Sequence, residues 1–170
     1  MSEAPILLAC GTQEPFDRLV RAVDRWAGAS GAAVFGQLGR LGPKSYRPAH
    51  FPFATHLPAC EFEARFDAAP IVIAHAGMGS IIGALSRAKP IVVMPRRAAL
   101  GEHRNDHQLA TVARFRSRAG IFVAEDETEL EDAIARALAA GQTGEGLGAW
   151  AEDRLLDALR AFIWEGRTPP

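Results

Sequence analysis

The sequence predicts an α/β fold: a Rossmann-like, mostly parallel sheet with helices on both of its faces. Short runs in which every residue is apolar, such as 71–74 and 91–94, alternate with longer amphipathic stretches, which is typical of βαβ units. Strands that are apolar at every position are covered on both faces, as the strands of parallel sheets are. Ligands of such folds bind outside the carboxyl ends of the strands, so the loops that follow strands are where a site is expected.

The predicted elements alternate along the chain. Residues 6–10 read as a buried strand, and the apolar residues between Phe16 and Trp26 recur at helical spacing. Further strands are expected at 33–35, 51–57, 71–74, 91–94 and 121–123, and further helices at 61–68, 80–88, 105–118 and 129–140. The prolines of 51–57 favour an edge position for that strand, because proline cannot donate to a strand ladder.

The length of the chain suits one domain. A chain of 170 residues can bury a sizeable core, so we expect a single domain over 1–170 with its core at about 5–140. A glycine-rich loop, 141–148, then leads into a terminal helix at about 148–165. That helix carries an apolar stripe, which includes Leu155 and Leu159.

Charge and cysteine content disfavour several classes of function. Lys plus Arg is 19 and Asp plus Glu is 20, so the net charge of −1 gives no reason to expect a nucleic-acid partner. Cys10 and Cys60 form neither a disulfide framework nor a metal-spaced cluster, and they suit a reducing cytosol. No run approaches the roughly 20 apolar residues of a membrane-spanning helix. We therefore expect a cytoplasmic protein that reaches a membrane only through a partner.

The first candidate loop lies between the first strand and the first helix. Gly11 allows the backbone to approach a ligand closely, and the Thr12 hydroxyl can donate to a phosphate oxygen. Gln37 ends the second strand and is expected at the same edge of the sheet. A tight turn in which Thr12 or Asp17 caps the helix explains the first loop equally well. The dinucleotide pattern G-x-G-x-x-G is absent, which disfavours NAD or FAD.

The second loop, 75–80, reads His-Ala-Gly-Met-Gly-Ser and is the most informative motif. It follows a buried strand and precedes a helix, whose N-terminus offers backbone N–H groups and a positive dipole end to an anion. Gly77 and Gly79 permit close approach, and Ser80 adds a hydroxyl donor. This combination suits a diphosphate. The alternative is that Ser80 is a simple N-cap and His75 a satisfied histidine at a strand end.

The third loop, 95–108, is dense in charge for an otherwise balanced chain. Arginines such as Arg96 can clamp phosphate oxygens through two parallel hydrogen bonds. Asp106 and Gln108 can accept from and donate to sugar hydroxyls. Two plainer interpretations stay open: Asn105 with Gln108 has the spacing of a capping box, and a run of charges is usually a solvated surface.

Four motifs in this order resemble those of the C-terminal, donor-binding domain of glycosyltransferase family 28. They are Gly11-Thr12 with 16–19 (Phe-Asp-Arg-Leu), then 75–80, then Lys89-Pro90 before 92–95 (Val-Val-Met-Pro), and 105–110 (Asn-Asp-His-Gln-Leu-Ala). The resemblance extends over roughly 6–140. It is closest to stand-alone donor-binding subunits, such as the catalytic subunit of the dolichol-linked GlcNAc transferase and the bacterial two-subunit exopolysaccharide glycosyltransferases.

The resemblance implies the C-terminal half of a GT-B enzyme: an inverting hexosyltransferase that uses a UDP-sugar and a lipid-linked acceptor at the cytoplasmic membrane face. It implies that the diphosphate is held by Gly11, Thr12, His75, Gly77, Gly79 and Ser80, and the donor sugar by Asp106 and Gln108. The expected donor site also includes Gln37, Met78, Arg96 and Glu102, and His75 and Asp106 are the candidate catalytic residues. No metal or other cofactor is implied. A membrane-associated partner subunit is expected to supply the acceptor-binding half with its general base.

The chain departs from the family pattern at Gly83. Members of the family often carry a glutamate there, early in the helix after the glycine loop, to bind the ribose. Glu102 is a candidate substitute. The departure keeps open an alternative in which the protein binds nucleotide sugars without catalysing transfer. A third interpretation is an unrelated α/β enzyme acting on a sugar phosphate, because fold does not fix function.

Overall fold

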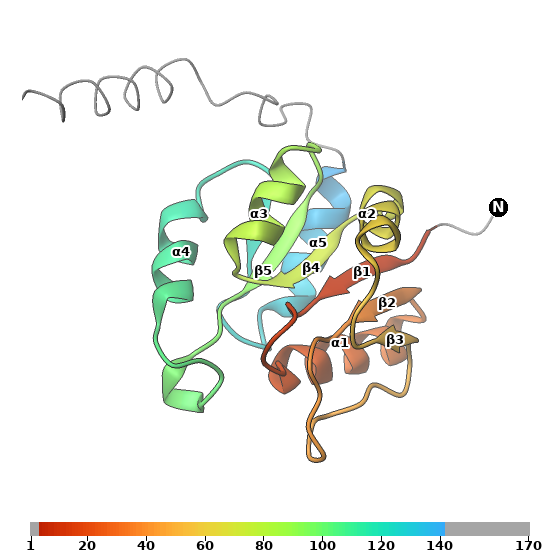
Figure 1. The fold of residues 1–170 in the computed structure, drawn as a ribbon. Helices are drawn as coiled ribbons and strands as arrows, with labels where there is room; N and C mark the ends of the chain where they lie inside the picture. The colour runs from red at the N-terminus through yellow and green to blue at the C-terminus, as the bar shows by residue number, and fades with distance from the viewer. Residues whose placement is uncertain (1–3, 142–170) are drawn as a thin grey trace, which may run out of the picture.

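The computed structural model describes residues 4–141, which form one six-stranded sheet between two layers of helices (Figure 1). The strands are β1 (Ile6–Ala9), β2 (Val34–Gln37), β3 (Phe53–Ala54), β4 (Val72–His75), β5 (Ile91–Met94) and β6 (Ile121–Val123). The helices are α1 (Asp17–Ser30), α2 (Ala59–Ala68), α3 (Met78–Leu85), the 3-10 helix η1 (Ala98–Leu100), α4 (His107–Phe115) and α5 (Leu130–Ala140). The predicted α/β, Rossmann-like class is confirmed.

All neighbouring strands pair in parallel, in the order β3-β2-β1-β4-β5-β6. The chain runs outward from β1 to β3 and then returns to place β4 on the other side of β1. The strand order therefore reverses between β1 and β4, and the loops that follow these two strands diverge there. Such a switch point is where open parallel sheets bind their ligands.

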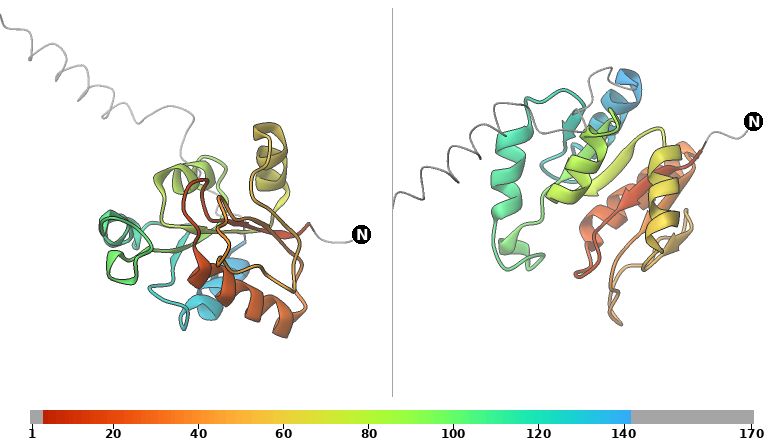
Figure 2. Two further views of the ribbon diagram at one scale, coloured as in Figure 1. Left: turned by 60° about the horizontal axis from the view of Figure 1, so that its bottom comes forward. Right: turned by 45° about the horizontal axis from the view of Figure 1, so that its top comes forward.

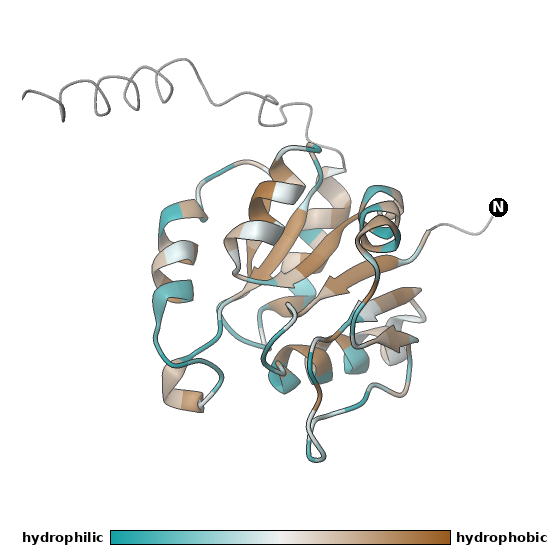
Figure 3. Cartoon of the chain, in the orientation of Figure 1, coloured by the Kyte–Doolittle hydropathy of each residue, from teal (hydrophilic) through white to brown (hydrophobic). Residues whose placement is uncertain are grey.

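Helices cover both faces of the sheet: α1 and α5 lie on one face, and α2, α3 and α4 on the other (Figure 2). The two cores divide the strand residues by alternation. Leu8 belongs to the core with α1 and α5, whereas its neighbours Leu7 and Ala9 belong to the core with α2, α3 and α4. This explains why the strands are apolar apart from Gln37 and His75 at the ends of β2 and β4, and why they form the most hydrophobic part of the chain in Figure 3.

A long loop, residues 38–52, joins β2 to β3 and lies against α1. Asp24 of α1 is buried and accepts hydrogen bonds from the Tyr46 hydroxyl (2.6 Å) and from the backbone N–H groups of Ala49 (3.1 Å) and His50 (2.8 Å). Gly28, one turn further along α1, makes room for the His50 ring, since a Cβ there would lie 2.9 Å from it. The loop is thus fastened to the helix at several points.

The ends of several elements differ from the prediction. The strand predicted at 51–57 is reduced to β3, and the helix predicted from 105 starts at 107 with Asp106 as its N-cap residue. The capping box of Asn105 and Gln108 is wrong, because Asn105 Oδ1 accepts the His107 N–H and Gln108 Oε1 accepts the Arg96 N–H. The predicted terminal helix at about 148–165 lies outside the described residues. Within residues 4–141, no helix has the length and apolar character needed to cross a bilayer.

Candidate functional site

Two neighbouring pockets open at the carboxyl edge of the sheet and share the residues Gly11 and Thr12. The first, here called the polar pocket, has a volume of about 260 Å³. It is lined by Cys10, Gly11, Thr12, Gln13, Glu14, His75, Arg96, His103 and Arg104. The second, here called the aromatic pocket, has a volume of about 380 Å³. Its lining includes Gln37, His56, Leu57, Phe62, Glu63, Phe66, Gly79, Ser80, Gly83 and Arg87.

The ring of His75 is wedged between the first two candidate loops. A Cβ on Gly11 would lie 3.2 Å from Cε1 of His75, and a Cβ on Gly77 would lie 2.9 Å from both Cδ2 and Cε1. Gly11 also has a φ of 85°, which disfavours any side chain there. Both glycines are therefore required by the imidazole between them. Sequence reasoning assigned these glycines to ligand approach, and their packing on His75 is an additional role.

Burial decides the charge of His75. Desolvation lowers the pKa of the imidazole below its usual value, and the nearby cation Arg96 acts in the same direction. Nδ1 lies 3.3 Å from the carbonyl oxygen of Ala9. Since a carbonyl only accepts, Nδ1 carries the proton in this hydrogen bond, and Nε2 of the neutral ring holds a free lone pair. The ring can therefore accept a proton when an anion binds beside it.

The N-terminus of α3 supplies donors between the two pockets. The first intrahelical hydrogen bond runs from the Ile81 N–H to the Gly77 carbonyl (3.2 Å), so the N–H groups of Met78, Gly79 and Ser80 have no acceptor within the helix. Gly77 is the N-cap residue and makes no side-chain cap bond. Ser80 is the third residue of the helix, which makes the simple N-cap interpretation of Ser80 wrong. This end of α3 can receive an anion.

Arg96 has a different role from the free phosphate clamp that the sequence predicts. Its side chain is buried and lies over the Phe16 ring, 4.6 Å from the centroid. Nη2 donates to the carbonyl oxygens of Cys10 (2.8 Å) and Glu14 (2.7 Å), and Nη1 donates to that of Pro15 (2.7 Å). The guanidinium therefore holds the loop 10–15 in place from the loop after β5.

Glu102 is engaged in a comparable way. Its carboxylate pairs with Arg18 at 2.7 Å and 2.9 Å and accepts the backbone N–H of Arg97 at 2.9 Å. The hydrogen bond with Glu102 raises the pKa of Arg18, which keeps the guanidinium charged. Glu102 lines neither pocket in this structure. It fastens the third loop to α1, which is not the ribose contact proposed from the sequence.

Asp106 and Gln108 also stabilise the third loop. Oδ1 of Asp106 accepts the Ala98 N–H at 2.8 Å, while the side chain stays exposed. Gln108 is buried, and its Oε1 accepts the Arg96 N–H at 3.0 Å. Neither residue lines the polar pocket. In this structure the two side chains hold the main chain that carries Arg96.

Gln37 and Lys89 each fasten a neighbouring segment through main-chain groups. Gln37 is buried, and its Oε1 accepts the Leu57 N–H at 2.9 Å, which holds the segment after β3 beside the aromatic pocket. Lys89, from the predicted Lys-Pro motif, is buried and donates Nζ to the carbonyls of Asp67 (2.9 Å) and Ala69. Lys89 therefore closes the end of α2 and contacts neither pocket.

Several pocket residues were not predicted from the sequence. Phe62 and Phe66, whose ring centroids are 5.8 Å apart, face the aromatic pocket from α2. Their i, i+4 spacing is visible in the sequence, but it indicates a core-facing helix as readily as a pocket. His103 lines the polar pocket, and its Nδ1 is buried without a partner among the described residues. A buried nitrogen of this kind is available to a ligand.

The family model of the glycosyltransferase family 28 C-terminal domain matches residues 6–145. The chain belongs to this family. The match contains all three candidate loops and the whole sheet. It bears out the resemblance read from the four motifs. Comparison with curated proteins gives no significant sequence match.

Solved structures share the fold at low sequence identity. ALG13, solved by NMR, is 18% identical with a TM-score of 0.56, and the match covers 92% of this chain and 94% of ALG13. The glycotransferase of kitacinnamycin is 17% identical with a TM-score of 0.55, covering 97% of this chain and 40% of that one. The UDP-GlcNAc 2-epimerase of Methanocaldococcus jannaschii, solved with UDP-GlcNAc and UDP, is 11% identical with a TM-score of 0.56, covering 92% and 45%.

The coverage separates these neighbours into two kinds. This family 28 domain spans less than half of the kitacinnamycin enzyme and of the epimerase, but almost all of ALG13. The neighbours also catalyse different reactions, because one is an epimerase. Likeness at this identity therefore establishes the fold, and the family model establishes the glycosyltransferase type of domain.

Proposed function

We propose that this chain is the donor-binding subunit of an inverting glycosyltransferase that uses a UDP-sugar. It transfers a hexosyl group to a lipid-linked acceptor in exopolysaccharide or glycan assembly. The observation that carries the proposal is the pair of pockets that share Gly11 and Thr12. A nucleotide sugar has an aromatic base at one end and a polar sugar at the other, joined by a diphosphate. The aromatic pocket matches the base, the polar pocket matches the sugar, and the shared residues Gly11 and Thr12 lie where the diphosphate would be.

Each part of the donor has a matching surface. The base and ribose lie in the aromatic pocket against Phe62 and Phe66, and the diphosphate crosses the shared edge between Thr12 and the N-terminus of α3. The sugar enters the polar pocket beside His103 and Arg104. Stabilising the charge that develops on the departing UDP is then the main catalytic contribution of this subunit, made by preorganised N–H groups.

His75 adds a proton to this arrangement. The neutral ring meets the diphosphate with a free Nε2, and the negative charge of the diphosphate opposes the effect of burial and raises the pKa of the imidazole. The ring then takes up a proton and donates from Nε2 to a phosphate oxygen. We propose that no metal ion is needed, because the N–H groups and this imidazolium take the charge of the leaving group.

The remaining parts of the proposal concern the assembly. A membrane-associated partner subunit supplies the acceptor-binding half and the general base, and it places this cytoplasmic chain at the membrane. The support is the family resemblance together with ALG13, a solved chain of which 94% is covered and which therefore consists almost entirely of this domain. The exposed side chain of Asp106, which belongs to the third loop, is the proposed contact for the donor sugar.

A calorimetric titration with UDP tests the donor site, with ADP and CMP as controls. We expect UDP to bind and Ser80→Ala and Thr12→Ala each to weaken binding by about tenfold, because each removes a hydrogen bond to a charged group. Ser117→Ala, an exposed serine without a hydrogen-bond partner in the described residues, is the matched control. Failure of UDP to bind, both alone and with the partner subunit, would contradict the proposal.

A noncatalytic nucleotide-sugar-binding protein is the second candidate. Gly83 favours it, since the position faces the aromatic pocket without a side chain. The distinction is made by measuring sugar transfer from a UDP-sugar after the partner subunit is added. Transfer that disappears in Ser80→Ala supports the enzyme, whereas UDP binding without transfer to any lipid-linked acceptor supports the second candidate.

A further inference from the structure

The net charge of −1 conceals an uneven distribution of charge. From Arg25 to Cys60 the sequence contains no acidic residue, although it contains Arg25, Arg40, Lys44 and Arg47. In the fold this stretch comprises the end of α1, β2, and the loop 38–52 that lies against α1. Two of these cations, Lys44 and Arg47, flank Tyr46 in the part of the loop that is bound to α1.

Four cations form a surface that we call the basic surface: Arg21 and Arg25 of α1, and Lys44 and Arg47 of the loop. All four are exposed, and none forms an ion pair within residues 4–141. Arg21 and Arg25 are separated by one helical turn and so share a face of α1. The guanidinium of Arg21 lies 4.2 Å from the centroid of the Tyr46 ring, between Lys44 and Arg47 in sequence.

The basic surface is held in place by the buried carboxylate of Asp24. Burial alone would raise the pKa of Asp24, but hydrogen bonds from Tyr46, His50 and Ala49 outweigh it and leave the pKa below its usual value. Asp24 is therefore ionised at neutral pH and holds the loop by both Tyr46 and the main chain. Its carboxylate forms hydrogen bonds with the loop and no ion pair with any of the four cations.

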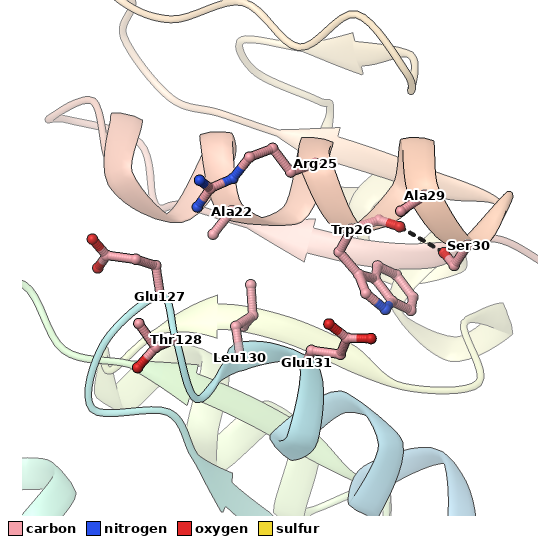
Figure 4. Close-up of a pocket in the computed structure, with 9 residues that line it drawn as sticks. All are labelled: Ala22, Arg25, Trp26, Ala29, Ser30, Glu127, Thr128, Leu130 and Glu131. Atoms are coloured by element: carbon pink, nitrogen blue, oxygen red, sulfur yellow. Dashed lines mark hydrogen bonds between the residues drawn. The ribbon is translucent and has the colours of Figure 1, made fainter.

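The cations do not converge on one cavity. Arg25 borders the hollow between α1 and α5, which has a volume of about 720 Å³ and carries Glu127 and Glu131 on its opposite side (Figure 4). Lys44 borders a different pocket, beside Pro15 and Asp17. The two glutamates limit the basic surface on the α5 side. Because neither cavity gathers the four cations around one point, the basic surface suits a plane of phosphate groups better than a single small anion.

We propose that the basic surface docks this chain directly on an anionic lipid bilayer. Each exposed Lys or Arg near such a surface contributes an attraction that corresponds to about a fivefold change in binding at low ionic strength. Tyr46, whose hydroxyl is bound to Asp24 and whose ring lies against Arg21, fixes the loop that carries Lys44 and Arg47 beside α1. This lipid contact is additional to any membrane attachment through a partner subunit.

Sedimentation of the full chain with lipid vesicles tests this proposal. Vesicles of phosphatidylcholine alone are compared with vesicles that contain about 30% phosphatidylglycerol, at about 0.05 M and about 0.5 M NaCl. We expect binding to the anionic vesicles only, and its loss at the higher salt concentration. Lys44→Gln with Arg47→Gln, and separately Arg21→Gln with Arg25→Gln, should each weaken it by about 20-fold.

The matched control removes two charges from elsewhere on the surface. Arg114→Gln with Arg118→Gln changes exposed arginines at the end of α4 and just after it, and it should alter vesicle binding by less than about threefold. UDP titration of every variant shows that it is folded with its donor site intact. Equal vesicle binding by wild type and the Lys44/Arg47 variant would overturn the proposal. So would displacement by inorganic phosphate at matched ionic strength, which would indicate a site for a single anion.

Discussion

The ring of His75 occupies the space that a side chain at Gly77 would need. A Cβ built on Gly77 would lie 2.9 Å from two ring carbons of His75, and nearer still to Nε2. The backbone of Gly77 itself, with a φ of −90° and a ψ of 136°, is open to any residue. The requirement for glycine at this position therefore comes from one neighbouring side chain and not from the main chain.

Gly77→Ala should destabilise the fold by about 1–3 kcal/mol, because the new methyl group must displace the packed imidazole. The effect should largely disappear in the double variant His75→Ala with Gly77→Ala, in which the clash is removed. Urea unfolding of the four proteins of this cycle measures it. Gly79→Ala is the control, since a Cβ there meets nothing within 4 Å. Additive effects of the two changes would show that the clash is absent.

Arg96→Lys should lower the free energy of unfolding by about 3 kcal/mol. A lysine keeps the charge but cannot reach the carbonyls of Cys10, Glu14 and Pro15 together, so buried acceptors lose their partners. Urea denaturation provides the measurement. Arg114→Lys on the exposed side of α4 makes the same chemical change and should cost less than about 0.5 kcal/mol. Similar values for the two variants would contradict the role given to Arg96.

The two cysteines should differ in reactivity toward a thiol reagent. Burial raises the pKa of Cys10 to about 12, so its thiolate is scarce at neutral pH, whereas Cys60 is exposed. One thiol should react in the folded protein and both in denaturant. Cys60→Ser should leave the folded protein unreactive, and Cys10→Ser should leave the labelling rate of Cys60 in the folded protein unchanged. Fast labelling of Cys10 in the folded chain would show that the first loop opens.

Acidification should weaken the fold partly through His75. Burial holds the pKa of the folded imidazole below the value of about 6.5 that it has in an unfolded chain, so the unfolded state binds more protons. Stability should therefore fall as the pH decreases through and below 6.5. Urea unfolding of wild type and His75→Gln at several pH values separates this contribution. An identical pH dependence in both proteins would assign it to other groups.

Binding of UDP should favour the protonated form of His75 over the neutral form, because the negative charge of UDP stabilises the imidazolium. Calorimetry in two buffers of different ionisation enthalpy should show proton uptake by the wild-type complex and less uptake by His75→Gln. The subtraction removes the contribution of UDP itself, which titrates identically in both experiments. Equal proton uptake would mean that His75 stays neutral beside the nucleotide.

The strands of the sheet were predictable because each is marked by an apolar run in its own stretch of sequence. The runs 71–74, 91–94 and 121–123 match β4, β5 and β6 within one residue at each end. The ends of other elements depend on distant partners. The start of α4 is held by the hydrogen bond between Asp106 and Ala98. The segment after β3 is held by the hydrogen bond between Gln37 and Leu57. No local pattern contains such pairs, which explains the shifted boundaries.

The same distinction applies to the site. The motif 75–80 could be recognised because strand, glycines and helix are adjacent in sequence. The role of Arg96 could not, because three of the four carbonyls that its guanidinium contacts lie 81 to 86 residues away. Charged residues in a loop look alike in sequence whether they face a ligand or hold another loop. Glu102 and Gln108 were grouped with ligand contacts for that reason.

The shortness of the outermost strands has a consequence for assembly. β3 has two residues and β6 has three, whereas the four strands between them have four each. An incoming strand would find few free N–H and C=O groups along either margin, so the sheet is a poor template for extension by another polypeptide. Any companion of this domain is therefore expected to meet its helices and loops, and self-propagating strand exchange between copies is disfavoured.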